Sequence, residues 1–180
     1  VRSREPGTRT MQGSPAGRAL FLDRDGVLNQ DVGYVGSVDR LTLIDGAVAA
    51  VRRANAAGYR VFVVTNQSGV ARGYFTEDDV RSLHAWMRAQ FAGQGARIDA
   101  FRYCPHHPEG IVPAYAQVCD CRKPAPGLFR ALIGEYGIDP ARSLMIGDGA
   151  RDLAAARAVG IPAHLFEGGN LDAFLAPLLA

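Results

Sequence analysis

Two carboxylates, Asp23 and Asp25, stand two residues apart directly after the short apolar run Ala19–Leu22. In extended backbone, side chains two residues apart point to the same side, so both carboxylates face one crevice. Neighbouring carboxylates repel each other unless a cation lies between them or one of them holds a proton. Mg²⁺ prefers oxygen ligands and leaves room for a phosphate. The pair therefore predicts a catalytic Mg²⁺ site, and the plainer alternative is a strand-end turn in which an Asp caps a helix.

A second group of polar side chains follows the apolar run 59–65. It consists of Thr65, Asn66, Gln67 and Ser68, with Gly69 behind them. Their hydroxyl, amide and loop N–H groups can hold phosphate oxygens. Taken alone, the segment reads as an ordinary polar turn. Its place after a strand next in sequence to the Asp23 strand makes Thr65 and Asn66 candidate phosphate ligands.

Lys123 is the only lysine among the 20 basic residues of the chain. Together with Arg122 it precedes a predicted helix N-terminus, where two cations are unfavourable unless an anion lies between them and the N–H groups. A compact ammonium suits a crowded phosphate site better than a guanidinium does. A solvated basic pair is the alternative. Asp148 follows another strand and can reach the ion of Asp23, whereas Asp152 can brace Lys123 or the metal shell.

All three cysteines of the chain lie between residues 104 and 121. Cys104, Cys119 and Cys121 form with His106 a Cys₃His set, which fits a structural Zn²⁺ with no open position. His107 is a possible substitute for His106. The pairs are separated by single residues, so the pattern is not that of a zinc finger, and three buried free cysteines are the alternative. An odd, clustered set of thiols also predicts a reducing compartment, the cytoplasm.

Short apolar runs alternate with helical patterns along the chain, which is typical of a parallel α/β sheet with helices on both faces. Strands are predicted over 19–22, 59–65, 98–103, 143–147 and 161–166, and helices over 47–57, 77–92, from Pro126 onward, over 150–159 and in the last ten residues. Asp45 is the expected N-cap of the first helix and Thr76 that of the second. Ligands of such sheets bind outside the carboxyl ends of the strands, where the chemical side chains gather.

Residues 1–18 are rich in Gly, Pro, Ser, Thr and Arg and are predicted to form a flexible tail before one domain over 19–180. The net charge is +2, and because the tail carries +3 the domain sums to −1. That balance gives no electrostatic footprint for nucleic acid. No apolar run approaches the roughly 18 residues of a membrane-spanning helix. We expect a monomer that acts on a small molecule.

Four segments of the chain resemble the motifs of the haloacid-dehalogenase-like phosphohydrolases. They are FLDRDGVLN, VVTNQ, RKP and MIGDGARD, and the resemblance spans 19–165. It implies a Rossmann-like sheet and catalysis through an aspartyl-phosphate. Asp23 would be the nucleophile, and Asp25 would be the general acid and then the base. Thr65 and Lys123 would hold the phosphoryl oxygens.

The same resemblance implies how Mg²⁺ would be bound, through the Asp23 carboxylate, the Asp25 backbone carbonyl and Asp148. Between Gly33 and Arg72 there is no room for a cap domain, so the chain resembles the capless branch of the family, in which surface loops select the substrate.

The loops DVGYV, TNQSGVARG, CPHHPEG and VCDCRKP are most similar to those of branch members that remove the C7 phosphate of heptose 1,7-bisphosphate, in the synthesis of nucleotide-activated heptose. The resemblance therefore implies a phosphorylated sugar as substrate. The candidate contacts are Asp31, Gly33, Tyr34, Gln67, Ser68 and Arg122. Histidinol-phosphate phosphatases share the zinc loop and are the alternative, because Asp31 and Glu109 could bind the positive groups of histidinol phosphate. Gly149 stands where many heptose phosphatases have lysine.

Overall fold

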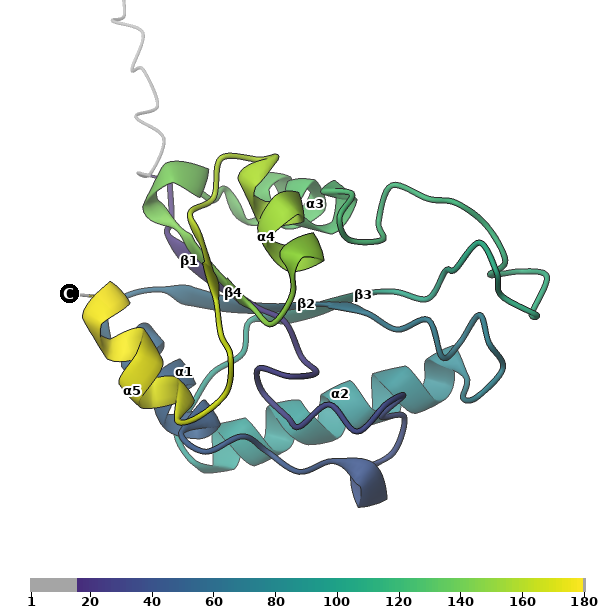
Figure 1. Cartoon of the computed structure of the whole chain (residues 1–180). Helices are drawn as coiled ribbons and strands as arrows, with labels where there is room; N and C mark the ends of the chain where they lie inside the picture. The colour runs from purple at the N-terminus through teal and green to yellow at the C-terminus, as the bar shows by residue number, and fades with distance from the viewer. Residues whose placement is uncertain (1–15, 180) are drawn as a thin grey trace, which may run out of the picture.

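The computed structural model describes residues 16–179 and has a sheet of five parallel strands between two layers of helices (Figure 1). The strands are β1 (Ala19–Leu22), β2 (Arg60–Asn66), β3 (Ala100–Cys104), β4 (Leu144–Gly147) and β5 (Ala163–Leu165). Their order in the sheet is β3-β2-β1-β4-β5, and each neighbouring pair is parallel. The predicted sheet is confirmed: β1 has the expected bounds, and the ends of the other strands differ by at most two residues from those expected.

The helices lie on both faces of this sheet, as the alternating pattern predicts (Figure 1). One face is covered by α1 (Ala47–Ala56), α2 (Glu77–Gly93) and α5 (Leu171–Leu175), and the other by α3 (Gly127–Tyr136) and α4 (Ala150–Arg157). Along β1, Leu20 and Leu22 pack in the first layer, whereas Phe21 packs against Phe62 and Phe129 in the second. Burial on both faces explains why the strands read as continuous apolar runs.

The starts of α1 and α2 show one wrong and one correct prediction. Thr76 caps α2 through the expected capping box with Asp79. Asp45, however, is not the N-cap of α1; Gly46 takes that position with φ 77°. A Cβ on Gly46 would collide with the Asn170 side chain at the start of α5, so close packing of two helices decides this start.

The segments that join strands to helices at the carboxyl edge are loops. The chain between β1 and α1 contains only the 3₁₀ turn Val38–Arg40, and further 3₁₀ turns cover Pro140–Arg142 and Ala176–Leu178. Within residues 16–179 no separate cap domain is therefore present, as expected. The irregular stretch between β3 and α3 is long and reaches the same edge. No helix in this part of the chain has the length and hydropathy needed to span a bilayer.

Only the last three residues of the predicted tail, 16–18, belong to the described part of the chain. Residues 1–15 lie outside the described part of the chain. The Gly17 N–H donates to the Gly137 carbonyl at 2.9 Å, and the Asp139 N–H donates to the Gly17 carbonyl at 2.8 Å. The Arg18 guanidinium lies 4.4 Å from the centroid of the Tyr59 ring. The predicted boundary therefore falls inside a segment that already pairs with the domain.

Candidate active site

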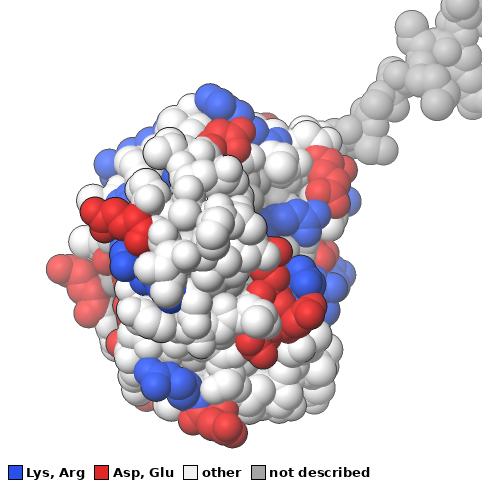
Figure 2. All heavy atoms as spheres, turned by 90° about the vertical axis from the view of Figure 1, so that its right-hand side faces the viewer, with Lys and Arg blue, Asp and Glu red and all other residues white. Residues whose placement is uncertain are grey.

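A polar cavity of about 270 Å³ lies at the carboxyl ends of β1 and β2. Its walls come from the loops after β1, β2 and β3, from the end of β2 and from the first turn of α4. They include Asp23, Asp25, Asp31, Gly33, Tyr34, Thr65, Asn66, Gln67, Ser68, Gly69, Arg72, His107, Arg122 and Arg151. The sheet thus brings most of the predicted site residues together. Figure 2 looks at the molecule from the side on which the loops after β2 and β3 lie, where acidic and basic groups are interspersed around a largely uncharged centre.

Asp23 lies at the floor of this cavity and is only 3% exposed. Its Oδ1 accepts a hydrogen bond from the Arg24 backbone N–H at 2.7 Å and lies 3.0 Å from the Lys123 ammonium. Burial raises the pKa of Asp23 to about 7, against the lowering effect of Lys123. A divalent cation beside Asp23 would favour the carboxylate and oppose this burial effect.

Lys123 lies behind Asp23 and does not line the cavity. Its ammonium donates to the Val64 carbonyl at 2.7 Å and forms ion pairs with Asp23 Oδ1 at 3.0 Å and Asp152 Oδ1 at 2.7 Å. The lysine side chain is fully buried. The predicted direct contact with phosphate would need one of these partners to be exchanged. The brace predicted between Asp152 and Lys123 is present.

Three carboxylates gather where the Mg²⁺ site is predicted. Oxygens of Asp23, Asp148 and Asp152 lie within 4.8 Å of one another. Asp152 is already bonded to Lys123 and to the Gly149 N–H at 3.0 Å. Asp148 Oδ1 is buried and has no hydrogen-bond partner among residues 16–179. Burial and the nearby Asp152 raise the pKa of Asp148. Asp23 and Asp148 thus fit a hard cation.

Gly26 permits the close approach of the segment after β1, which carries Asp23, and the segment after β4, which carries Asp148. Its φ is 81°, and a Cβ at this position would collide with the Asp148 carboxylate. The tight turn that follows Asp25 therefore needs glycine at position 26, both for the positive φ and to leave room for the Asp148 carboxylate.

The Asp25 carboxylate, 20% exposed, borders the cavity and is held from behind. Oδ1 accepts from the Asn29 amide at 2.9 Å, and Oδ2 accepts from the Gln67 amide at 2.8 Å. The Arg24 guanidinium donates to both oxygens. This carboxylate is therefore oriented by three side chains.

The polar residues after β2 have more specific contacts than the sequence indicated. Gln67 is buried, and its amide also donates to Thr65 Oγ1 at 2.8 Å. Asn66 bonds reciprocally to the backbone of Lys123, at 3.0 Å in each direction. Asn66 therefore holds the loop that contains Lys123, and Gln67 orients the side chains of Asp25 and Thr65. Thr65 and Ser68 line the cavity.

The mouth of the cavity carries two arginines that were not among the predicted site residues and a histidine that was considered only as a zinc ligand. Arg72, His107 and Arg151 line it together with the predicted Arg122. Arg72 and His107 lie 3.3 Å apart through their side-chain nitrogens. Each of the three stands in a segment already noted for its motif, but their convergence depends on how three loops fold. Glu109 does not line the cavity.

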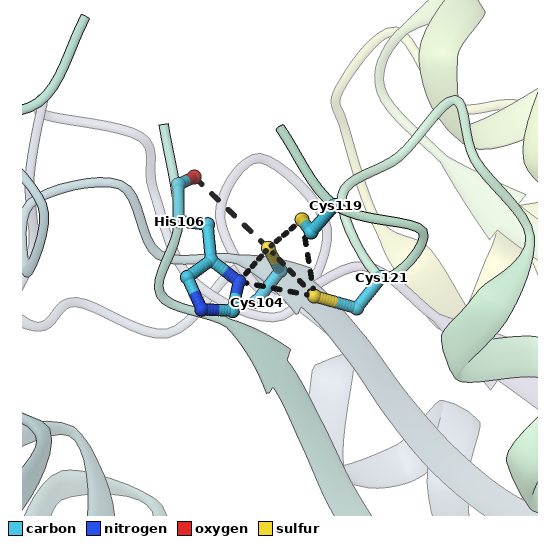
Figure 3. A group of neighbouring side chains, drawn as sticks. All are labelled: Cys104, His106, Cys119 and Cys121. Atoms are coloured by element: carbon cyan, nitrogen blue, oxygen red, sulfur yellow. Dashed lines mark hydrogen bonds between the residues drawn. The ribbon is translucent and has the colours of Figure 1, made fainter. Parts of the chain in front are cut away.

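The predicted Cys₃His set converges in the loop between β3 and α3, with all four side chains pointing toward one another (Figure 3). Cys104 Sγ lies 3.5 Å from Cys119 Sγ and 3.1 Å from Cys121 Sγ, and His106 Nδ1 lies 3.4 Å from Cys121 Sγ. The three cysteines are free thiols. His107 is turned to Arg72 instead, so the structure selects His106 as the fourth member.

The chemistry of this cluster fits Zn²⁺, which takes four sulfur and nitrogen ligands in structural sites. Burial raises the pKa of the Cys104 thiol, and it raises the pKa of Cys121 to about 11. A bound dication would reverse that preference, because it stabilises thiolates. The Arg122 guanidinium donates to the His106 carbonyl at 3.3 Å, which links the cluster to the cavity.

A family model described as haloacid dehalogenase-like hydrolase matches residues 7–160 of this sequence. The sequence is also 52% identical over 166 residues to the D-glycero-beta-D-manno-heptose-1,7-bisphosphate 7-phosphatase of Rhodopseudomonas palustris, covering 92% of each chain.

Solved structures agree with this similarity. The D,D-heptose 1,7-bisphosphate phosphatase of B. bronchiseptica, complexed with magnesium and phosphate, matches with a TM-score of 0.76 and 37% identity, over 89% of this chain and 86% of the other. A putative HAD-like phosphatase from Mesorhizobium loti matches with a TM-score of 0.80 and 34% identity, over 87% and 75%.

Proposed function

Because the chain belongs to the haloacid dehalogenase-like hydrolases, we propose that it is a Mg²⁺-dependent phosphatase that removes the C7 phosphate of D-glycero-β-D-manno-heptose 1,7-bisphosphate. The R. palustris relative is named for this reaction, and the cavity of this chain has side chains that suit it. This combination carries the proposal. The floor has the carboxylates for phosphoryl transfer, and the mouth has arginines for a second phosphate.

Phosphoryl transfer would begin at Asp23. Its Oδ1 is bonded to Lys123 and to the Arg24 N–H, which leaves Oδ2 to attack phosphorus. The P–O bond to C7 breaks as the bond to Asp23 forms, and Asp25 gives a proton to the leaving sugar oxygen. Asp25 then takes a proton from water, whose oxygen attacks the aspartyl-phosphate and releases inorganic phosphate and Asp23.

Mg²⁺, held by the Asp23 carboxylate, the Asp25 backbone carbonyl and Asp148, would supply charge neutralisation during transfer. Thr65 lines the cavity and can donate its hydroxyl to a phosphoryl oxygen. Lys123 neutralises Asp23 from behind and becomes a phosphate ligand where it exchanges one of its three partners.

Substrate selection would depend on the residues at the mouth. A phosphate on a primary carbon can enter the cavity while the sugar ring stays outside. Asp31, Tyr34 and Ser68 offer oxygen atoms to its hydroxyl groups, and Gly33 lies in the loop that carries Asp31 and Tyr34. Arg122 can bind the remaining phosphate bidentately. The β anomer in the proposal follows the name of the relatives.

Histidinol phosphate is the less favoured substrate because its non-reacting part is positively charged. Arg72, Arg122 and Arg151 line the mouth, whereas Asp31 is its main acidic group. Glu109, the other carboxylate considered for this substrate, lies away from the cavity lining.

We further propose that the Cys₃His set holds one structural Zn²⁺, and that the protein acts as a cytoplasmic monomer in the synthesis of nucleotide-activated heptose, without binding nucleic acid or membranes. The support for zinc is the convergence of four candidate ligand atoms, whose three cysteines form no disulfide with one another. Such a site would fix the loop that presents Arg122 and His107 to the cavity.

The test is a side-by-side comparison of kcat/KM for the heptose bisphosphate and for histidinol phosphate at saturating Mg²⁺, because this ratio measures discrimination. The kcat/KM for the heptose bisphosphate is expected to exceed that for histidinol phosphate by at least about tenfold. If histidinol phosphate wins, the substrate assignment fails while the phosphatase chemistry stands.

A further inference from the structure

Arg24, between the two catalytic carboxylates, is the largest side chain that is fully buried. Its Nε donates to Asp25 Oδ1 at 3.2 Å, and its NH2 group lies 3.0 Å from each Asp25 oxygen. NH2 also lies 2.6 Å from the Val35 carbonyl and 3.0 Å from Gln67 Oε1. A buried guanidinium is costly unless its donors are satisfied, and here they converge on one carboxylate and its neighbours.

The remaining nitrogen of Arg24 is held by a residue from a distant helix. Arg24 NH1 lies 3.2 Å from His84 Nε2, and because a guanidinium can only donate, His84 is the acceptor. His84 comes from α2 and is 5% exposed. Its ring stacks on Phe101 with the centroids 4.6 Å apart and meets the edge of Tyr103. Burial, more than the nearby arginines, lowers the pKa of His84 to about 3, which keeps it an acceptor.

We propose that Arg24 is a positioning residue for Asp25 and that His84 of α2 holds Arg24 in place for this task. The inference rests on the proposed function, in which Asp25 protonates the leaving sugar oxygen. A guanidinium is planar and presents two nitrogens to one carboxylate in a fixed orientation, so it sets the direction of the Asp25 carboxyl group. Asn29 and Gln67 hold the same carboxylate from the two sides.

The position of the Asp25 carboxyl group affects the rate most when the leaving group needs a proton. A sugar alkoxide is a poor leaving group and depends on proton transfer, which contributes about 10²–10⁴-fold to the rate. The nitrophenolate of p-nitrophenyl phosphate leaves without a proton. A misplaced Asp25 should therefore slow the release of the sugar and spare the release of nitrophenolate, whereas general damage to the fold slows both.

The first experiment measures the release of the first product in the pre-steady state for wild type and Arg24→Lys, with the heptose bisphosphate and with p-nitrophenyl phosphate. Lysine keeps the charge but loses the planar pair of donors. Release of the sugar is expected to slow by about 30-fold, within the range for general acid catalysis. Nitrophenolate release should change by less than about threefold. Equal losses on both substrates, or no loss on either, would overturn the proposal.

A second set of variants keeps the test decisive if Arg24→Lys fails to fold. His84→Leu removes the acceptor, whereas His84→Gln keeps an oxygen near the position of Nε2. We expect His84→Leu to slow sugar release selectively and His84→Gln to restore most of it. Gln90→Ala, on the exposed side of α2, is the control and should match wild type. If the Leu and Gln variants behave alike, His84 does not act through Arg24.

Wild type separates the two claims. If it releases no sugar from the bisphosphate in the first turnover, the proposed function fails. If it does and the variants show no selectivity, only the positioning role fails.

Discussion

Among single residues, Lys123 shows why charge alone does not define a site. Its ammonium donates to the Val64 carbonyl and is ion-paired with the buried carboxylates of Asp23 and Asp152. The planar, longer side chain of arginine cannot satisfy all three in a fully buried position. We expect Lys123→Arg to lower kcat by about 10² or more, the effect of losing one pre-organised electrostatic group.

Arg122→Lys is the matched control for this variant, because it makes the converse change at the neighbouring position. Arg122 borders the cavity mouth and should affect mainly KM. A Lys123→Arg enzyme with nearly normal kcat would show that the lone lysine has no geometric role.

The sequence predicted which chemical side chains meet at one edge of the sheet where strand topology alone places them. Asp23, Asp25, Thr65 and Asp148 follow strands of one parallel sheet, whose carboxyl ends must meet. The network behind Asp25 was not predicted, because Arg24 meets His84 only after α2 packs on the sheet. No local pattern marks a contact between residues 60 positions apart.

At the scale of elements, α2 ties the stability of the fold to pH through His84. The pKa of His84 is about 3 in the folded chain, below the ordinary value of 6.5, because the ring is buried. Between these values the unfolded chain binds the additional proton, so the unfolding free energy falls as pH drops below about 6.5. The slope from this one group is about 1.4 kcal/mol per pH unit.

Urea denaturation at pH 7 and pH 5 checks this expectation when wild type is compared with His84→Gln. The difference between the two proteins isolates His84 from the titrating carboxylates. Wild type should lose more unfolding free energy on acidification than the variant does. Equal losses in both proteins would contradict a neutral, buried His84.

The loop between β3 and α3 depends on its four ligands. Cys119→Ser should reduce the zinc content from about one ion per chain to near zero, because three ligands hold Zn²⁺ poorly. The loop should become sensitive to protease, and KM should rise because Arg122 and His107 come from this loop. Elemental analysis, limited proteolysis and kinetics measure the three effects.

Val118→Ala is the control for the zinc prediction, since Val118 is adjacent and 84% exposed. It should retain zinc and KM. Wild-type protein purified without chelator and found free of zinc would refute the metal assignment.

Element predictions failed where tertiary packing outweighs local preference. Asp45 has the right side chain for an N-cap, but the close approach of α5 places Gly46 there. The 3₁₀ turns were not predicted because so few residues carry no periodic pattern.

For the whole molecule, a single sheet edge combines the chemistry and the selection of substrate. The loop after β1 contributes Asp25 and Tyr34, the loop after β2 contributes Ser68, and the zinc loop contributes Arg122. The sequence predicted the fold class because alternating runs define a parallel α/β sheet. It predicted Arg122 but not Arg72 and Arg151 at the mouth, since the convergence of these three arginines needs the surrounding loops in their final conformations.

The central claim, that this mouth directs the C7 phosphate to Asp23, has a direct test in the product. ³¹P NMR of D-glycero-β-D-manno-heptose 1,7-bisphosphate with enzyme and Mg²⁺ shows which phosphate leaves. With wild type we predict that the C7 phosphate resonance disappears, that a signal of inorganic phosphate appears, and that the C1 phosphate resonance remains. With the Asp23→Asn variant the spectrum of the substrate should not change. Release of the C1 phosphate, or equal turnover by the Asp23→Asn variant, would contradict the account.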